Sequence, residues 1–297
     1  MEFKTILYEL DEEVPQIAWV TLNRPSQNNA VSIGAEEMTG EIKRAMERVN
    51  EEDVKVAIFR SNGRNFSAGF DLKMVYRVYG GSPGVRPSQR KRLITDDSQL
   101  FGFVRAILSC TKVTMAQVHG WCIEAGMWIP ECCDIAIAAE SAKFAHRGQR
   151  LAFGGMPLTP LEMLGGHAKK IRELLITGRA IAAREAESCG IITRAVPDAD
   201  LESEVRALAR AICVLPRDAI VMGKMCTRQT LDSVGFLNPD ASVVYHTLGT
   251  NIKYEQDEEE LMFIKGREEM GARSAFHRHH ELFEAALDRT KYFRSVR

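Results

Sequence analysis

Several features that would narrow the function are missing from this chain of 297 residues. Neither charge is in excess, with 39 Lys and Arg against 40 Asp and Glu, so bulk charge gives no reason to expect nucleic-acid binding. No run of about 18 apolar residues is present, and the first residues, MEFKTILYEL, lack the apolar stretch of a signal peptide. We therefore expect a cytoplasmic protein that binds neither nucleic acid nor membrane.

The cysteines lack the patterns of a metal site or a disulfide framework. There are seven, an odd number, scattered at positions 110, 122, 132, 133, 189, 213 and 226. The adjacent pair Cys132 and Cys133 has neither metal-ligand spacing nor a matching second pair. Several of the others lie in apolar segments, which favours reduced thiols in a core. We expect no bound metal.

Strands and helices alternate along the first two thirds of the chain. Apolar patterns predict strands at 17–25, 54–63, 113–120, 133–140 and 191–197, and helices at 35–52, 98–110, 168–178, 182–190 and 201–216. The first strand–helix–strand unit implies a parallel pair with a right-handed crossover, and the nearly continuous apolar strand 133–140 implies cover on both faces. The fold class is therefore a layered α/β core. Residues 77–97, rich in Gly, Pro, Ser and Arg, predict a surface loop, and the last eighty residues look mostly helical.

Two glycine-containing turns follow predicted strands, NGRNFSAGFDLK (62–73) and HGWCIEAG (119–126). Ligand sites in α/β cores tend to lie at the carboxyl ends of strands, and glycine lets backbone approach a ligand closely. Two such turns facing each other supply two backbone N–H donors to one developing oxyanion. The alternative is two plain strand-to-helix turns.

The segments that carry these turns resemble the crotonase superfamily, the enoyl-CoA hydratase and isomerase relatives. Five segments match the family in order and spacing over roughly residues 1–200: LNRPSQNNAVS (22–32), GRNFSAGFDLK (63–73), VHGWCIEAG (118–126), CDIAIAAESAKFA (133–145) and LLITGRAIAAREAESCGIITRAVP (174–197). The resemblance implies a spiral core of ββα units at 1–200 and a C-terminal helical region at 201–297. It further implies self-association as a homotrimer or as a hexamer, a dimer of trimers.

The resemblance also implies an acyl-CoA thioester as substrate, with coenzyme A as part of that substrate and no tightly bound cofactor. By position in the motifs, the thioester oxygen is held by the backbone N–H groups of Phe70 and Ala125. Arg24, Ala68 and Lys73 are the positions expected to contact the CoA moiety. For the two cations, the alternative is that they are exposed and only aid solubility.

This chain departs from the family at both catalytic carboxylates. Hydratases of the family carry one glutamate three residues past the second donor and another four residues past the phenylalanine of the AKF motif. These positions hold Trp128 and Gly148 here. Trp128 is expected to make the substrate pocket drier and more aromatic, which suits an aromatic or alicyclic acyl group, unless it is simply a packed core residue. Ordinary water addition by two glutamates cannot be transferred to this chain.

Three nearby residues are candidates for the missing acid–base groups, since a base must reach the substrate's α or β carbon. Glu124 directly precedes the second donor; its alternative role is to cap the helix that begins there. His146 lies in the loop that lost the second carboxylate, and its alternative is a surface histidine. Glu131 follows Trp128 by about one helical turn, and its alternative is a salt bridge or contact with solvent.

Four other residues have both a functional and a structural interpretation. Arg147 is suited to a substrate carboxylate but is equally consistent with a solvated side chain. Asp71 is more typical of a structural hydrogen-bond acceptor than of a base. His277 and His280, in the cluster FHRHH, share a helix face, but no carboxylate-rich motif accompanies them. We expect that face to be solvated and near a subunit contact rather than to bind metal.

The function that the sequence predicts is an acyl-CoA enzyme that works through an oxyanion-stabilised enolate. Water addition or elimination, as in a hydratase or isomerase of the lyase class, is the leading reaction. The alternative reaction is carbon–carbon bond hydrolysis or retro-Claisen cleavage of a CoA ester. The alternative without catalysis is an acyl-CoA-binding pseudoenzyme.

Overall fold

The computed structural model describes residues 2–74, 88–91, 93, 98–151, 167–233, 266, 269–290 and 295–296. Its larger sheet has the strand order β1-β2-β3-β4-β6-β9. The strands are β1 (Ile6–Leu10), β2 (Ile17–Leu22), β3 (Val56–Ser61), β4 (Val113–Val118), β6 (Ile135–Ala139) and β9 (Arg194–Val196). All neighbours are parallel except β1, which pairs with β2 in the antiparallel sense. The predicted parallel pair, β2 and β3, is confirmed.

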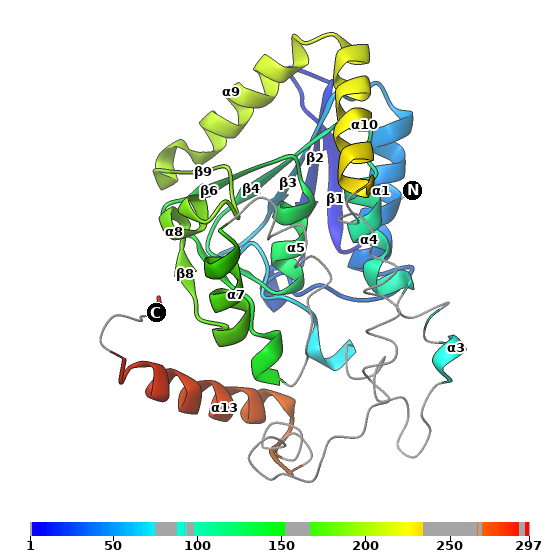
Figure 1. The fold of residues 1–297 in the computed structure, drawn as a ribbon. Helices are drawn as coiled ribbons and strands as arrows, with labels where there is room; N and C mark the ends of the chain where they lie inside the picture. The colour runs from blue at the N-terminus through cyan, green and yellow to red at the C-terminus, as the bar shows by residue number, and fades with distance from the viewer. Residues whose placement is uncertain are drawn as a thin grey trace.

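Helices cover both faces of this sheet (Figure 1). On one face lie α1 (Met38–Glu51), α4 (Ser98–Leu108) and α5 (Ala125–Cys132), and on the other lies α9 (Leu201–Cys213). Strand β6 makes the arrangement clear, because Ala136 and Ala138 belong to the first apolar cluster and Ile137 to the second. Cover on both faces, predicted from the continuous apolar run, is therefore confirmed.

A second, three-stranded sheet was not predicted from the sequence. It has the order β5-β7-β8, formed by β5 (Trp121–Ile123), β7 (Lys143–Ala145) and β8 (Ile181–Ala182). Strands of two or three residues are too short to show an alternating apolar pattern. This small sheet matters for function, because β5 leads directly into the turn before α5 and β7 leads into the loop that carries His146.

The remaining helices follow the predicted order. They are α7 (Ala168–Thr177), α8 (Ala183–Ser188), α10 (Arg217–Ser233) and α13 (Ala272–Leu287). A three-residue helix, α3 (Gln89–Lys91), falls within the predicted surface loop, most of which lies outside the described residues. The division of the chain at residue 200 stays a prediction; α9, just beyond it, packs on the main sheet.

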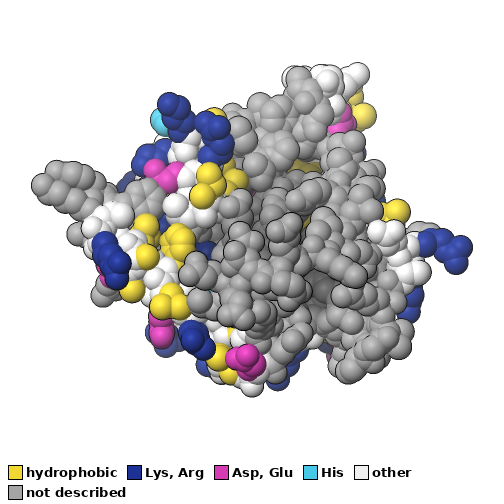
Figure 2. Space-filling view, turned by 60° about the horizontal axis from the view of Figure 1, so that its bottom comes forward, with side chains coloured by type: hydrophobic (Ala, Val, Ile, Leu, Met, Phe, Trp, Pro, Cys, Tyr) yellow, Lys and Arg dark blue, Asp and Glu magenta, His cyan; other side chains and the backbone are white. Residues whose placement is uncertain are grey.

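The described surface mixes charges, as the composition predicts. On the face shown in Figure 2, Lys and Arg side chains are interspersed with hydrophobic and acidic ones. In the part of the chain that the structure describes, no helix has the length and apolar character needed to cross a membrane.

Candidate active site

The two glycine turns singled out in the sequence lie against each other. Ser67 and Cys122 form a parallel bridge, and the N–H of Ile123 donates to the carbonyl oxygen of Ser67 at 3.0 Å. The contact depends on two glycines. A Cβ at Gly69, where φ is +86°, would lie 2.9 Å from Glu124 Cβ, and one at Gly126 would lie 2.6 Å from Ser67 Cβ. The sequence needs glycine there because any side chain would push the turns apart.

Each turn carries one backbone N–H that takes no part in the backbone pairing of the described residues. Phe70 bridges Val31 in the parallel sense through Gly69 O and Asp71 N, so its own N–H faces away from that pairing. Ala125 is the first residue of α5, and the first N–H groups of a helix have no partner within it. Among the described residues, no backbone acceptor is found for either group. The two positions therefore offer two donors from turns that touch.

Trp128 is packed into an aromatic cluster beside the first donor. Its ring meets that of Phe70 edge to face, with 5.1 Å between centroids and 81° between planes. On α4, Phe101 and Phe103 stack on it at 5.6 and 6.3 Å. Trp128 is 4% exposed, which agrees with the alternative of a packed core residue; its effect on a substrate pocket stays a prediction.

Glu124 joins the second turn to the loop that follows β7. Its carboxylate accepts hydrogen bonds from the backbone N–H groups of Arg147 and Gly148, and its own N–H donates to Ala145 O at 3.1 Å. Burial raises the pKa of this carboxyl, although the charge of His146 and those two N–H groups oppose the shift. Glu124 occupies the N-cap position of α5, as its alternative role requires, but its side chain makes no capping hydrogen bond there. The residue has a positive φ of 49°, and its carboxylate binds the loop rather than the helix.

His146 and Glu131 form a buried pair. Nε2 of His146 lies 2.9 Å from Oε1 of Glu131, and their side chains are 5% and 3% exposed. The alternatives of a surface histidine and of a solvent-exposed glutamate are therefore wrong, because β7 and α5 carry both groups inward. The remaining alternative for Glu131, a salt bridge, matches this contact, which becomes an ion pair if the imidazole is protonated.

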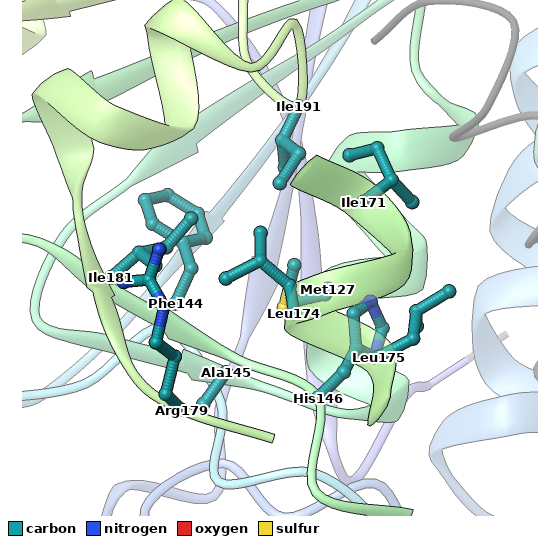
Figure 3. A pocket seen from close by; sticks show the side chains of 10 residues that line it. All are labelled: Met127, Phe144, Ala145, His146, Ile171, Leu174, Leu175, Arg179, Ile181 and Ile191. Atoms are coloured by element: carbon teal, nitrogen blue, oxygen red, sulfur yellow. The ribbon is translucent and has the colours of Figure 1, made fainter. Parts of the chain in front are cut away.

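A small cavity adjoins the imidazole of His146. Its volume is about 10 Å³, and apolar side chains line most of it, among them Leu174 and Leu175 of α7. Figure 3 shows the ring of His146 beside Leu175, with Arg179 on the opposite side of the cavity. A space of this size is of the order needed for one water molecule. His146 thus contacts a carboxylate and lines a small, mostly apolar cavity.

The loop carrying His146 is anchored to the C-terminal helix by Arg150. This buried guanidinium donates to Glu284 Oε1 at 2.8 Å, to His280 Nδ1 at 2.7 Å and to Thr177 O at 2.6 Å. Burial, followed by the charges of Arg147 and Arg150, lowers the pKa of His280 to about 4. The prediction of a solvated face is therefore wrong for His280, whereas His277 is exposed. Nothing in the sequence pointed to Arg150, because its partners on α13 lie 130 and 134 residues away.

The expectation of no bound metal stays a prediction. Among the described residues, no group of three or more His, Cys, Asp or Glu side chains is arranged to hold a metal ion. The seven cysteines carry no disulfide, and five of them are buried.

The positions expected near CoA differ in their contacts with the rest of the protein and in their exposure to solvent. Arg24 forms an ion pair with Asp71 at 3.0 Å and also donates to Ala30 O. Asp71 in addition accepts from the Lys73 N–H, which agrees with its interpretation as a structural acceptor. Ala68 and the side chain of Lys73 are exposed. Arg147, the candidate for a substrate carboxylate, is partly buried with its guanidinium 5.6 Å from the centre of the Trp121 ring.

Comparison with known proteins places this arrangement in a family. The family model of enoyl-CoA hydratase/isomerase matches residues 12–253. EchA13 of Mycobacterium tuberculosis is 34% identical over 254 residues, covering 79% of this chain and 77% of its own. Enoyl-CoA hydratase domain-containing protein 3 of Rattus norvegicus is 30% identical over 77% of this chain and 74% of its own.

Solved structures agree in fold. An enoyl-CoA hydratase from Mycobacterium smegmatis superposes with a TM-score of 0.78 at 25% identity, covering 95% of each chain. An enoyl-CoA hydratase/isomerase from Xanthobacter autotrophicus Py2 has a TM-score of 0.75 at 28% identity, covering 95% of this chain and 99% of its own. The chain belongs to the enoyl-CoA hydratase/isomerase family, within the crotonase superfamily, whose enzymes act on CoA thioesters.

Proposed function

We propose that this protein is an acyl-CoA enzyme that stabilises the enolate of its substrate between the N–H groups of Phe70 and Ala125. The observation that supports the proposal is the contact of the two turns that carry these residues, together with the absence of a described backbone acceptor for either N–H. A donor aimed at a developing oxyanion contributes typically about 2.7–4 kcal/mol to the transition state. Because both donors are backbone groups, the site does not depend on the identity of either side chain.

His146 acts as the proton-transfer group, and Glu131 positions it. This assignment rests on the 2.9 Å contact of the pair, on its burial, and on the adjacent cavity. Glu124 is less suited, because its carboxylate already accepts two backbone N–H groups. A carboxylate with those partners holds the loop in place more readily than it approaches a substrate carbon. Of the three candidates, His146 is therefore the one we favour.

The aromatic cluster around Trp128 favours an aromatic or alicyclic acyl group. A flat ring packs against Phe70 and Trp128 with more contact area than a flexible chain offers. Hydration or isomerisation remains the leading reaction. Cleavage of a carbon–carbon bond is the alternative, supported by the replacement of both usual carboxylates. Product analysis separates them, since only cleavage shortens the acyl chain.

The decisive experiment compares Ala125→Pro with Ala125→Gly on a panel of aromatic, alicyclic and linear acyl-CoA esters. Proline removes the N–H, and the first position of a helix is where proline is best tolerated. Turnover is expected to fall about a hundredfold or more in Ala125→Pro and to change little in Ala125→Gly. Equal turnover in the two variants excludes the donor role. Binding of esters without turnover of any would favour the pseudoenzyme.

Self-association as a trimer or hexamer is part of the same proposal. The family resemblance supports it, and light scattering at micromolar protein concentration tests it directly. A monomer under those conditions would contradict the predicted self-association. It would not bear on the thioester site, which the Ala125 variants test separately.

A further inference from the structure

Arg150 joins three separate segments of the chain beside the loop that carries His146. It lies in the short 3-10 helix Gly148–Leu151, four positions after His146, and its side chain is 2% exposed. Nε donates to the carbonyl oxygen of Thr177, the last residue of α7, at 2.6 Å. Nη1 donates to Glu284 Oε1 on α13 at 2.8 Å. One buried guanidinium therefore connects the loop, the end of α7 and the C-terminal helix.

The surface that α13 presents to Arg150 consists of three side chains on one helix face. His280, Phe283 and Glu284 are spaced so that they lie next to one another on a helix. The guanidinium carbon lies 4.0 Å from the centre of the Phe283 ring, and Nη1 lies 2.7 Å from His280 Nδ1. Because arginine has only donors, Nδ1 is the acceptor in that bond. An acceptor, an aromatic face and a carboxylate thus meet one planar cation, which suits arginine and not lysine.

The contacts of Arg150 also fix the backbone of His146 against α7. Gly178 ends α7 with a left-handed φ of 58°. A Cβ there would lie 2.8 Å from His146 O and 2.9 Å from Arg150 Nε. The end of α7 therefore packs directly on the backbone of His146, and the carbonyl that Arg150 binds belongs to the adjacent residue. Carbonyls at the end of a helix have no partner within it, so the guanidinium satisfies one of them.

The chain beyond α13 is attached to the same stretch of residues, 177–180. The N–H of Val296 donates to Ala180 O at 3.1 Å, and the N–H of Ala180 donates to Ser295 Oγ at 3.0 Å. In Figure 1, α13 lies below α7 and away from the main sheet. The C-terminal helix is thus held at two places, and both lie beside the residues that support the His146 loop.

We infer that Arg150 is a positioning residue for His146, and that α13 holds it in place through Glu284. The inference rests on the proposed role of His146 in proton transfer. A guanidinium stays protonated in proteins, so Arg150 takes no proton itself and acts through geometry. Misplacement of a reacting group by about 1 Å can lower a rate by about a hundredfold. The seating of α13 should therefore affect turnover more than it affects the binding of an ester.

The test removes the carboxylate from α13 in two ways. Glu284→Ala should lower turnover of the ester that the wild type turns over fastest by about tenfold. The dissociation constant of that ester should stay within about twofold. Glu284→Gln keeps an acceptor oxygen for Arg150 and should lose less than about threefold. Glu281→Ala, at an exposed position of α13, is the matched control and should behave as the wild type. Glu284 is itself 22% exposed, so its variants should fold.

A double variant separates positioning from general damage to the site. If Glu284 acts through His146, adding Glu284→Ala to His146→Gln should cause no further loss of turnover. A further loss of about tenfold would mean that α13 acts on another part of the site, and it would overturn the inference. Wild-type turnover in Glu284→Ala would overturn the inference alone. Wild-type turnover in His146→Gln, or no turnover of any ester, would overturn the proposed function and the inference with it.

Hydrogen exchange tests the structural half of the inference without any ester. The backbone amides of residues 146–150 should exchange severalfold faster in Glu284→Ala than in the wild type, because the loop opens more often when α13 no longer holds Arg150. Glu281→Ala should keep the wild-type exchange rates. Equal rates in the two alanine variants would show that α13 does not fix the loop, whatever the kinetics give.

Discussion

The two sides of the candidate site are built from different materials. On one side, backbone N–H groups of Phe70 and Ala125 are placed by a contact between turns, which glycine makes possible. The other side consists of two side-chain pairs, His146 with Glu131 and Arg150 with Glu284. The first side tolerates most side chains at the donor positions. The second side requires these particular side chains, because its contacts are made by side-chain atoms.

This difference has an energetic consequence. Backbone donors are uncharged and fixed by the bridges around them, so they cost little to hold in place. Buried ionisable pairs are stable only while both partners remain, since removing one leaves a charge uncompensated, at about 3–5 kcal/mol. Variants on the two sides should therefore lose activity for different reasons. On the first side the backbone donors are displaced, and on the second a reactive group is lost or a buried charge is left without its partner.

The largest effect is expected from the buried pair. His146→Gln should lower turnover about a hundredfold or more, because it removes the proton-transfer group, while the dissociation constant of a CoA ester changes little. Glu131→Gln should lower turnover less, by about tenfold, and should also shift the pH–rate profile, since it acts through His146. Steady-state kinetics and calorimetric titration measure these quantities.

Loss of stability must be separated from loss of chemistry in these variants. His146→Gln leaves the Glu131 carboxylate buried without its charged partner. The double variant Glu131→Gln/His146→Gln removes that charge, so stability should return while turnover stays low. His277→Gln, on the exposed face of α13, is the control. Full turnover in the double variant would show that neither residue transfers the proton.

On the backbone side, a substitution at the glycine contact should disturb the donor positions. Gly69→Ala places a Cβ 2.9 Å from Glu124 Cβ and 3.1 Å from Ile123 O at a φ of +86°. The strain should lower the free energy of unfolding by about 1–3 kcal/mol. Turnover should fall by about tenfold or more, because the Phe70 N–H is displaced from the oxyanion. Denaturant unfolding and kinetics test both expectations.

A matched glycine is available on α10. Gly223 has no atom within 4 Å of the added Cβ, so Gly223→Ala should stabilise the protein by about 0.5–1 kcal/mol through helix propensity and leave turnover unchanged. Similar effects of the two substitutions on stability and turnover would mean that the close contact of the turns is not what holds the donors.

The sequence predicts these two sides unequally. The turns around Phe70 and Ala125 carry local signals, namely glycine next to a strand end and a helix start, so their positions follow from short segments. The pair of His146 and Glu131 spans 15 residues and two elements, so each was a candidate without any indication that they meet. Arg150 had no signal at all, because its α13 partners are set by tertiary packing. The strands of the small sheet were missed for lack of length.

Glu124 connects the two sides, and its substitution should have the smallest effect. Its backbone belongs to the donor turn, and its carboxylate binds the N–H groups of Arg147 and Gly148 in the His146 loop. Glu124→Gln keeps the size and one acceptor oxygen. Turnover should change less than about threefold if the residue holds the loop and is not the base. A loss of about a hundredfold would return Glu124 to the role of base.

The pH dependence of stability tests more directly how the Glu124 carboxyl is held. Burial raises the folded pKa of this carboxyl above its ordinary 4.5, so the folded state keeps the proton to a higher pH than the unfolded chain does. Between the two pKa values the folded state binds more protons, and stability therefore falls as pH rises through that window. The wild type should lose stability relative to Glu124→Gln as pH rises above about 4.5, with a plateau above the folded pKa.

Urea unfolding of both proteins at fixed concentration measures this difference, and Glu47→Gln controls for the loss of one exposed charge on α1. A difference of the opposite sign would mean that the two backbone N–H groups outweigh burial, and that the carboxylate is held charged between the two sides of the site.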